Sequence, residues 1–305
     1  GENNLLISNH HIIYDGWSNG IILKEFQHCY NELVYGNLIK DNKKNSFKNY
    51  IKLNGNSSDE SKSFWKDYLK GYEFKSVFSP RHFNSSQDDS HNECYNLSIP
   101  EDTFQALKHI CESQRLTIAD VLYGAWGVLL SRYSGENDII FGTTVSGRNI
   151  KLDDVERMVG LFINTIPLRV NVLTGKSLIS IIKENANRTL ERRGFENVPL
   201  RNIIDYSGYK EEELYESIFV IENYPLDKEK LQLNNGLAFK LFSVKESTNY
   251  KLTVSAFLSN KIEISFNYLN AYFERELLES IGSHYVRLID FIINDSDSDI
   301  FSLDL

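Results

Sequence analysis

The sequence predicts an α/β fold in which helices and strands alternate and a β meander comes late in the chain. Runs with apolar residues at helical spacing are interspersed with short β-rich runs. In the last third, β-rich runs follow one another, with a turn at Ser259-Asn260. Together these patterns predict layers of helices packed on a sheet.

The first element expected is a short apolar strand at Leu5-Leu6-Ile7. A helix follows, for which Ser18 is the predicted N-cap and Gly36 the end, because apolar residues recur between them at helical spacing. Helical segments are expected between residues 46 and 72. The polar stretch 79–92 lacks periodicity and is interpreted as a loop between two lobes.

The second part of the chain opens with a strand at 95–100, and Pro100 begins a helix with two acidic residues in its first turn. A more apolar helix is predicted from the N-cap Thr117, with Asp120 at the third helical position and Gly135 at the end. The remaining predictions are strands at 137–145, 162–172, 216–225, 237–244, 251–259 and 261–269, and helices at 177–193 and 272–293.

Composition narrows the class of protein. A chain of 305 residues with 41% hydrophobic residues can bury one large core or two smaller ones. The net charge of −9 argues against nucleic acid as the main partner, and no stretch approaches the ~20 apolar residues of a membrane span. Three sparse cysteines suit a reducing compartment and no metal site, so the cytoplasm is expected. Because Met158 is the only methionine, we expect the chain to be a piece of something longer.

The stretch HHIIYDGWS, residues 10–18, is the main candidate for a catalytic site in the first part of the chain. It connects the predicted strand to the predicted helix, a setting in which scaffolds often present reactive side chains. An Asp four positions from a His can orient the imidazole, and a neutral imidazole suits proton transfer near neutral pH. A histidine that only satisfies hydrogen bonds at a strand end is the competing interpretation. Gly16 would allow a backbone geometry closed to other residues.

A second stretch, residues 145–170, places a Gly147-Arg148 turn and an acidic loop before Met158-Val159-Gly160 and a strand with Asn164 and Pro167. The two stretches resemble the condensation domains of non-ribosomal peptide synthetases, whose signatures are HHxxxDG and GRxxxxxxxxMVGxFxNTxPLR. The strand at 217–225 and the phrases SFWKDYLKG and AWGVLLSRYSGENDIIFG are similar to the family as well. The sequence DGWS favours peptide-bond-forming members over epimerising or heterocyclising ones.

The resemblance implies two chloramphenicol-acetyltransferase-like lobes with a tunnel between them. Residues 1–85 would be the remaining part of an incomplete N-terminal lobe, and residues 93–305 the C-terminal lobe. Donor and acceptor carrier proteins, beside an adenylation domain, would each deliver a phosphopantetheine arm, and this chain would bind no cofactor itself. The acceptor amine would attack the donor thioester and form an amide.

The resemblance also assigns roles to individual residues. His11 is the critical residue, either as a base or as a group that positions the amine and stabilises charge. Asp15 would be structural and paired with an arginine, Gly16 would keep the approach to His11 open, and His10 would be structural. For Arg148 and Asn164, an architectural role and a substrate contact near the tunnel both stay open. Trp17 is expected to pack rather than to bind a ligand.

In the family, about a quarter of the domain precedes HHxxxDG, and the arginine expected to pair with Asp15 belongs to that part. A buried Asp15 without this partner would cost several kcal/mol or become protonated. We therefore expect this chain alone to be inactive or weakly active, although the intact domain would be a condensation catalyst.

Two other functions stay open at this point. One is an acyltransferase that uses acyl-coenzyme A and a small alcohol or amine, and the other is a non-catalytic docking module of a megasynthase.

Overall fold

The structure is a computed structural model that describes residues 5–10, 12–39, 45–54, 58–74, 76, 78, 91–210, 214–222 and 250–303. Its contacts divide the chain into two compact units. Of the described residues, the first unit contains those within Gly1–Ser57 and Ser146–Asn164. The second contains those within Ser58–Val145, Thr165–Asn223 and Ser247–Leu305. The boundaries of these units differ from those of the predicted lobes, 1–85 and 93–305. The two lobes stay a prediction. Each unit is considered by itself.

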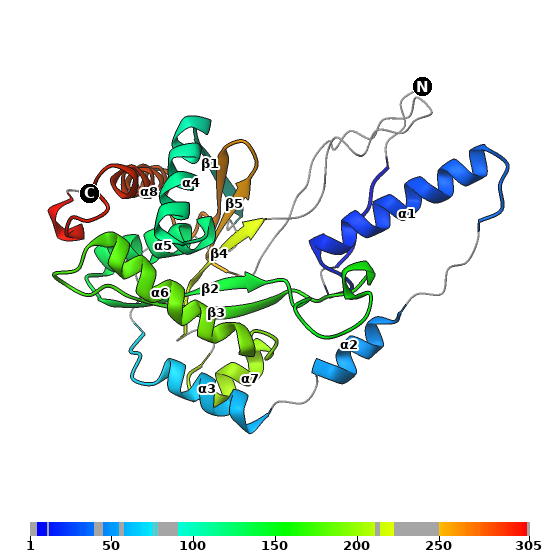
Figure 1. Cartoon of the computed structure of the whole chain (residues 1–305), viewed down its shortest axis with the longest axis horizontal. Coiled ribbons are helices and arrows are strands. Elements are labelled where there is room, and N and C mark those ends of the chain that lie inside the picture. The colour runs from blue at the N-terminus through cyan, green and yellow to red at the C-terminus, as the bar shows by residue number, and fades with distance from the viewer. Residues whose placement is uncertain are drawn as a thin grey trace. The chain divides into compact units, whose positions relative to one another are not determined.

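One sheet organises the second unit (Figure 1). Its six strands lie in the order β1-β6-β5-β4-β2-β3. The pairs β1–β6 and β5–β6 are antiparallel, whereas β4–β5 and β2–β4 are parallel. The strands are β1 Asn92–Ile99, β2 Asp138–Val145, β3 Asn164–Asn171, β4 Ser217–Glu222, β5 Leu252–Leu258 and β6 Ile262–Leu269.

The predicted strands in the described residues of this unit are confirmed. The β5–β6 hairpin closes at the expected turn, where the Ser259 amide donates to the Lys261 carbonyl over 3.1 Å. The predicted strand 237–244 and most of the predicted loop 79–92 lie outside the described residues.

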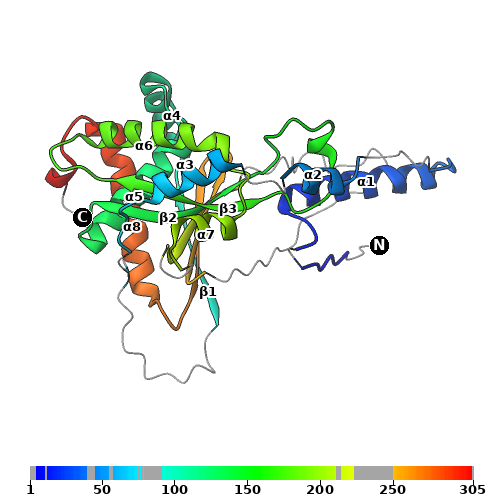
Figure 2. The same cartoon turned by 90° about the horizontal axis from the view of Figure 1, so that it is seen from below.

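Strand alternation distributes apolar side chains to both faces of the sheet. In β2, Ile139 and Phe141 pack with one group of helices, while Ile140 between them packs with another. The first group is α4 Glu101–Gln114, α5 Ile118–Ser134, α6 Leu178–Arg192 and α8 Arg275–Asp295. The second is α3 Asp59–Leu69 and α7 Leu200–Ser207 (Figure 2). Helices therefore cover both faces of the sheet around β2.

Helix α5 shows how closely this layer packs. Its N-cap Thr117 and Asp120 form the predicted capping box, and Gly135 ends it with φ 73°. A Cβ atom at Gly127 would lie 2.6 Å from Val170 on β3, so only glycine permits this approach of helix to sheet.

The first unit contains α1 Gly16–Val34 and α2 Phe47–Asn54. The N-cap of α1 is Asp15 rather than the predicted Ser18, because the Asp15 carboxylate accepts from the Ser18 amide. The strand predicted at Leu5-Leu6-Ile7 is wrong: residues 5–10 form no strand in the described part of the chain. A strand needs a hydrogen-bonded neighbour, and these three side chains are exposed.

A small apolar cluster completes the first unit. Tyr50, Val155, Met158 and Phe162 are buried in it, and Phe47 packs against them. The Phe47 and Phe162 rings meet edge to face with centroids 4.9 Å apart. Helix α2 is thereby packed on the segment that leads to β3. In neither unit is a described helix long and apolar enough to cross a membrane.

Candidate functional site

The loop that carries the histidines is a tight turn ahead of α1. The Ile13 amide donates to the His10 carbonyl over 3.0 Å, and the Ile12 amide donates to His10 Nδ1 over 3.1 Å. The exposed His10 ring thus accepts a bond from its own loop. His11, the residue predicted to be critical, lies outside the described residues.

Asp15 is the anchor of this loop. Only 3% of the residue is exposed, and its carboxylate lies in the first unit between α1 and the segment before β3. Oδ1 accepts from the Ser18 amide at 3.1 Å and from the Ser18 hydroxyl at 2.9 Å. Oδ2 accepts from the amides of Phe162 at 2.9 Å and Ile163 at 3.2 Å. The Asp15 amide in turn donates to the Gly160 carbonyl over 3.2 Å.

Arg148 is the arginine that pairs with Asp15. Its Nη2 lies 3.2 Å from Asp15 Oδ1, and the two side chains are 4% and 3% exposed. The prediction that this partner belongs to a segment absent from the chain is wrong. The pair joins residues 133 positions apart, so spacing along the chain could not reveal it. The expected cost of an unpaired buried Asp15 therefore does not arise.

Nη1 of Arg148 is bonded within the same segment, whereas its Nε is buried without a hydrogen-bond partner among the described residues. Nη1 donates to the carbonyls of Val155 at 2.6 Å and Met158 at 3.0 Å. The guanidinium carbon lies 3.9 Å from the centroid of the Phe162 ring. Burial lowers the pKa of Arg148, and the nearby Asp15 carboxylate opposes that shift. These contacts favour the architectural one of the two roles predicted for Arg148.

Of Gly16 and Gly147, only Gly147 has a backbone conformation that requires glycine. Gly16 is the first residue of α1 and does not have a positive φ, so its backbone conformation is one that other residues also adopt. The predicted special geometry is therefore wrong. Gly147 has φ +65°, and a Cβ there would lie 1.8 Å from the Phe162 carbonyl oxygen. The glycine requirement therefore falls on the Gly147-Arg148 turn.

Trp17 and Asn164 complete the predicted set. The Trp17 indole N–H donates to the Glu156 carbonyl over 3.0 Å, and its ring lies 5.5 Å from the Arg148 guanidinium. Trp17 therefore packs within the first unit, as predicted. Asn164 is partly buried at the first position of β3. The structure brings together Asp15, Gly16, Trp17 and Arg148.

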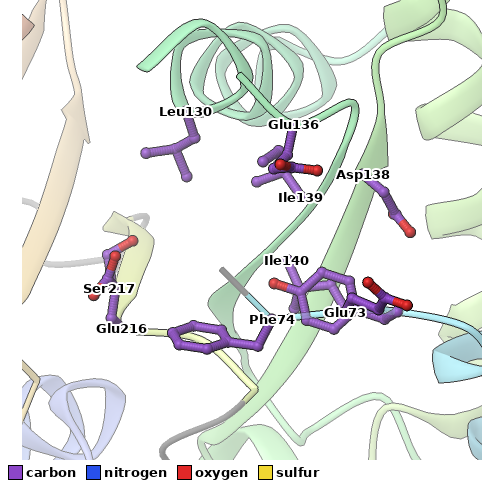
Figure 3. A pocket seen from close by; sticks show the side chains of 10 residues that line it. Glu73, Phe74, Leu130, Glu136, Asp138, Ile139, Ile140, Glu216 and Ser217 are labelled. Atoms are coloured by element: carbon purple, nitrogen blue, oxygen red, sulfur yellow. The ribbon is translucent and has the colours of Figure 1, made fainter. Parts of the chain in front are cut away.

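A separate pocket lies in the second unit (Figure 3). Four of its lining residues carry carboxylates: Glu73, Glu136, Asp138 and Glu216. Asp138 is paired with Arg169 at 2.5 Å, and Glu216 accepts from Ser76 at 2.8 Å. No lining residue belongs to the HHIIYDG or 147–169 stretches. Among the described residues, no group of His, Cys, Asp and Glu side chains is placed to hold a metal ion.

Comparison with known families decides the class of this protein. The family model described as Condensation domain matches residues 1–305. The chain belongs to the condensation domain family. The predicted resemblance is thereby confirmed, and members of this family form peptide bonds between carrier-bound substrates.

Individual relatives agree with this assignment. Tyrocidine synthase 2 of Brevibacillus parabrevis is 30% identical over 303 residues, which is 98% of this condensation domain chain but 8% of the synthase. The chain thus spans less than a tenth of that relative. A four-domain non-ribosomal peptide synthetase, AB3403, matches with a TM-score of 0.80 at 16% identity, over 95% of this chain and 23% of the other. The X-domain from teicoplanin biosynthesis matches with a TM-score of 0.79 at 18% identity, over 97% and 70%. These likenesses confirm the predicted α/β, chloramphenicol-acetyltransferase-like fold class.

Proposed function

We propose that this condensation domain joins a donor acyl or peptidyl thioester to an acceptor aminoacyl thioester during non-ribosomal peptide synthesis. The acceptor's α-amine attacks the donor carbonyl carbon, a C–N bond forms, and the C–S bond breaks. The amine loses a proton and the donor thiol regains one, so the lengthened chain resides on the acceptor arm. Holding the two reactants together could supply ~7–11 kcal/mol at best.

The observation that carries this proposal is the anchoring of Asp15. Four neutral donors and Arg148 hold its carboxylate, and this fixes the end of the loop that begins with the histidines. His11 precedes Asp15 by four residues along the chain, so it belongs to the loop whose end this anchor fixes. A rigid support of this kind is what a positioned catalytic imidazole requires.

The role of His11 within the reaction has two forms. As a base, it would accept the proton of the attacking amine. As a positioning group, it would orient the amine and stabilise the charge that develops at the carbonyl. The proposal includes His11 as the critical residue in either form.

The proposed partners follow from the family. An upstream and a downstream carrier protein would bring their phosphopantetheine arms into a tunnel between lobes formed by residues 1–85 and 93–305. An adenylation domain would lie beside this domain in a cytoplasmic synthetase. Because Asp15 is paired with Arg148, its burial is no longer a reason to expect weak activity of the chain alone. A turnover assay of the chain with two loaded carrier proteins tests that expectation.

A docking role is the second candidate function. The X-domain from teicoplanin biosynthesis, which shares this fold, has been solved in a complex with OxyB. That X-domain thus binds another protein, which supports a docking role for a domain of this fold. Transfer from acyl-coenzyme A remains the other enzymatic alternative.

Replacement of His11 in the intact domain separates these functions. We expect His11→Ala to lower peptide formation between two loaded carrier proteins by about 100-fold or more. The matched control is His109→Ala, which removes an exposed imidazole on α4 and should leave the rate unchanged. Peptide formation that is unaffected by His11→Ala would support the docking role. Transfer from free acyl-coenzyme A to a soluble acceptor would support the other enzyme.

A further inference from the structure

Ser18 lies at the junction of the two sequence motifs. It is fully buried in the third position of α1, two residues beyond the HHIIYDG stretch. Its hydroxyl contacts Gly160, which is 142 positions away in the segment Met158-Val159-Gly160, here called the MVG segment. The side chain predicted to cap α1 is therefore engaged in contacts between distant parts of the first unit.

The Ser18 hydroxyl uses its full hydrogen-bonding capacity. Its Oγ lies 3.2 Å from the Gly160 amide and 3.2 Å from Arg148 Nη2, and both of these groups donate to it. Its own proton has two acceptors within reach, Asp15 Oδ1 at 2.9 Å and the Gly160 carbonyl at 3.1 Å. A hydroxyl offers one donor and two acceptor lone pairs, so this arrangement saturates it. An alanine here would leave two buried donors without this acceptor.

We propose that Ser18 is a positioning residue for the condensation reaction, because its hydroxyl locks the Asp15–Arg148 pair to Gly160 and so holds the histidine loop in place. This inference rests on the proposed function. Ser18 acts through Asp15, whose amide is bonded to the Gly160 carbonyl and whose carboxylate receives the Phe162 amide. Without the hydroxyl, the start of α1 is free to shift against the MVG segment. The loop that precedes Asp15, described at His10, Ile12 and Ile13, would shift with it.

The principal test compares variants of the intact domain in its synthetase, with donor and acceptor carrier proteins loaded. Ser18→Ala should lower kcat per folded domain by about ten- to hundred-fold, because displacement of a catalytic group by about 1 Å has effects of this size. The KM for the carrier proteins should stay the same, since no docking surface is altered. Ser18→Thr retains the hydroxyl and should recover most of the lost kcat.

The matched control is Ser131→Ala on α5. Ser131 is also buried, and its hydroxyl donates to the Glu136 carbonyl over 2.6 Å in the second unit. Its loss should lower thermal stability without changing kcat per folded domain. A Ser18→Ala domain that is folded and has the kcat of the parent would overturn the proposal. Equal loss of kcat in folded Ser18→Ala and Ser18→Thr domains would overturn it too.

A measurement on the unsubstituted domain keeps the proposal testable if a variant does not fold. The Gly160 amide donates to Ser18 Oγ, so it should exchange with solvent deuterium as slowly as the Phe162 amide. Rapid exchange at Gly160 would refute the lock without any reference to catalysis. An unsubstituted domain that makes no peptide would refute the proposed function, while slow exchange at Gly160 would still support the lock.

Discussion

Replacement of Arg148 by methionine removes a charge from the interior while keeping a long side chain. The guanidinium is lost from Asp15 at 3.2 Å and from the carbonyls of Val155 and Met158 at 2.6 and 3.0 Å. Removal of one partner from a buried ion pair costs ~3–5 kcal/mol. Asp15 keeps the donors Ser18, Phe162 and Ile163, which places the expected cost at the lower end, about 3 kcal/mol.

Hydrogen exchange measures this cost where it arises. The amides of Phe162 and Ile163 both donate to Asp15 and report on local opening of the first unit. A loss of about 3 kcal/mol corresponds to roughly hundred-fold faster exchange under conditions where opening is in rapid equilibrium. Arg148→Lys retains the charge but loses the planar guanidinium. The exchange rates of the Phe162 and Ile163 amides in this variant should therefore lie between those of the parent domain and those of Arg148→Met.

The control for this experiment is an exposed ion pair of the same chemistry. Arg275 on α8 lies 3.0 Å from Glu279, and the two side chains are 56% and 48% exposed. Arg275→Met should leave the exchange of the Phe162 and Ile163 amides unchanged, because solvent screens such exposed pairs. If Arg148→Met destabilises the domain no more than Arg275→Met does, the buried pair is not the anchor inferred from the structure.

Two further predictions concern backbone strain and thiol reactivity. Gly147→Ala should destabilise the domain more than Gly208→Ala: both have positive φ, but only at Gly147 does a Cβ meet the Phe162 carbonyl. Equal unfolding free energies by urea titration would contradict this. Burial raises the pKa of Cys111 to about 11, so near neutral pH its thiol stays protonated and resists iodoacetamide, whereas exposed Cys94 reacts. Mass spectrometry of the native protein checks this, and prompt labelling of Cys111 would refute it.

The agreement between sequence and structure is best where the signal is local. The capping box of α5 and the glycine that ends it lie within a few residues of the helix they bound. Strand β6 alternates between buried and more exposed residues, so its apolar periodicity directly reflects which face is buried. The same reasoning fails at the start of α1, where Asp15 and Ser18 are both good N-caps. Contacts with Gly160 decide between them, and those contacts come from a distant segment.

By itself, the sequence determined the α/β class, most helices and strands of the second unit, and membership of the condensation domain family through two ordered motifs. Only the tertiary structure decided that Arg148 neutralises Asp15 and that Ser18 joins Gly160. Caps and alternation act between neighbours along the chain, so residue order suffices to reveal them. The Asp15–Arg148 pair joins segments that meet only when the chain has folded. Its strength depends on the exclusion of water around both groups, which local sequence does not reveal.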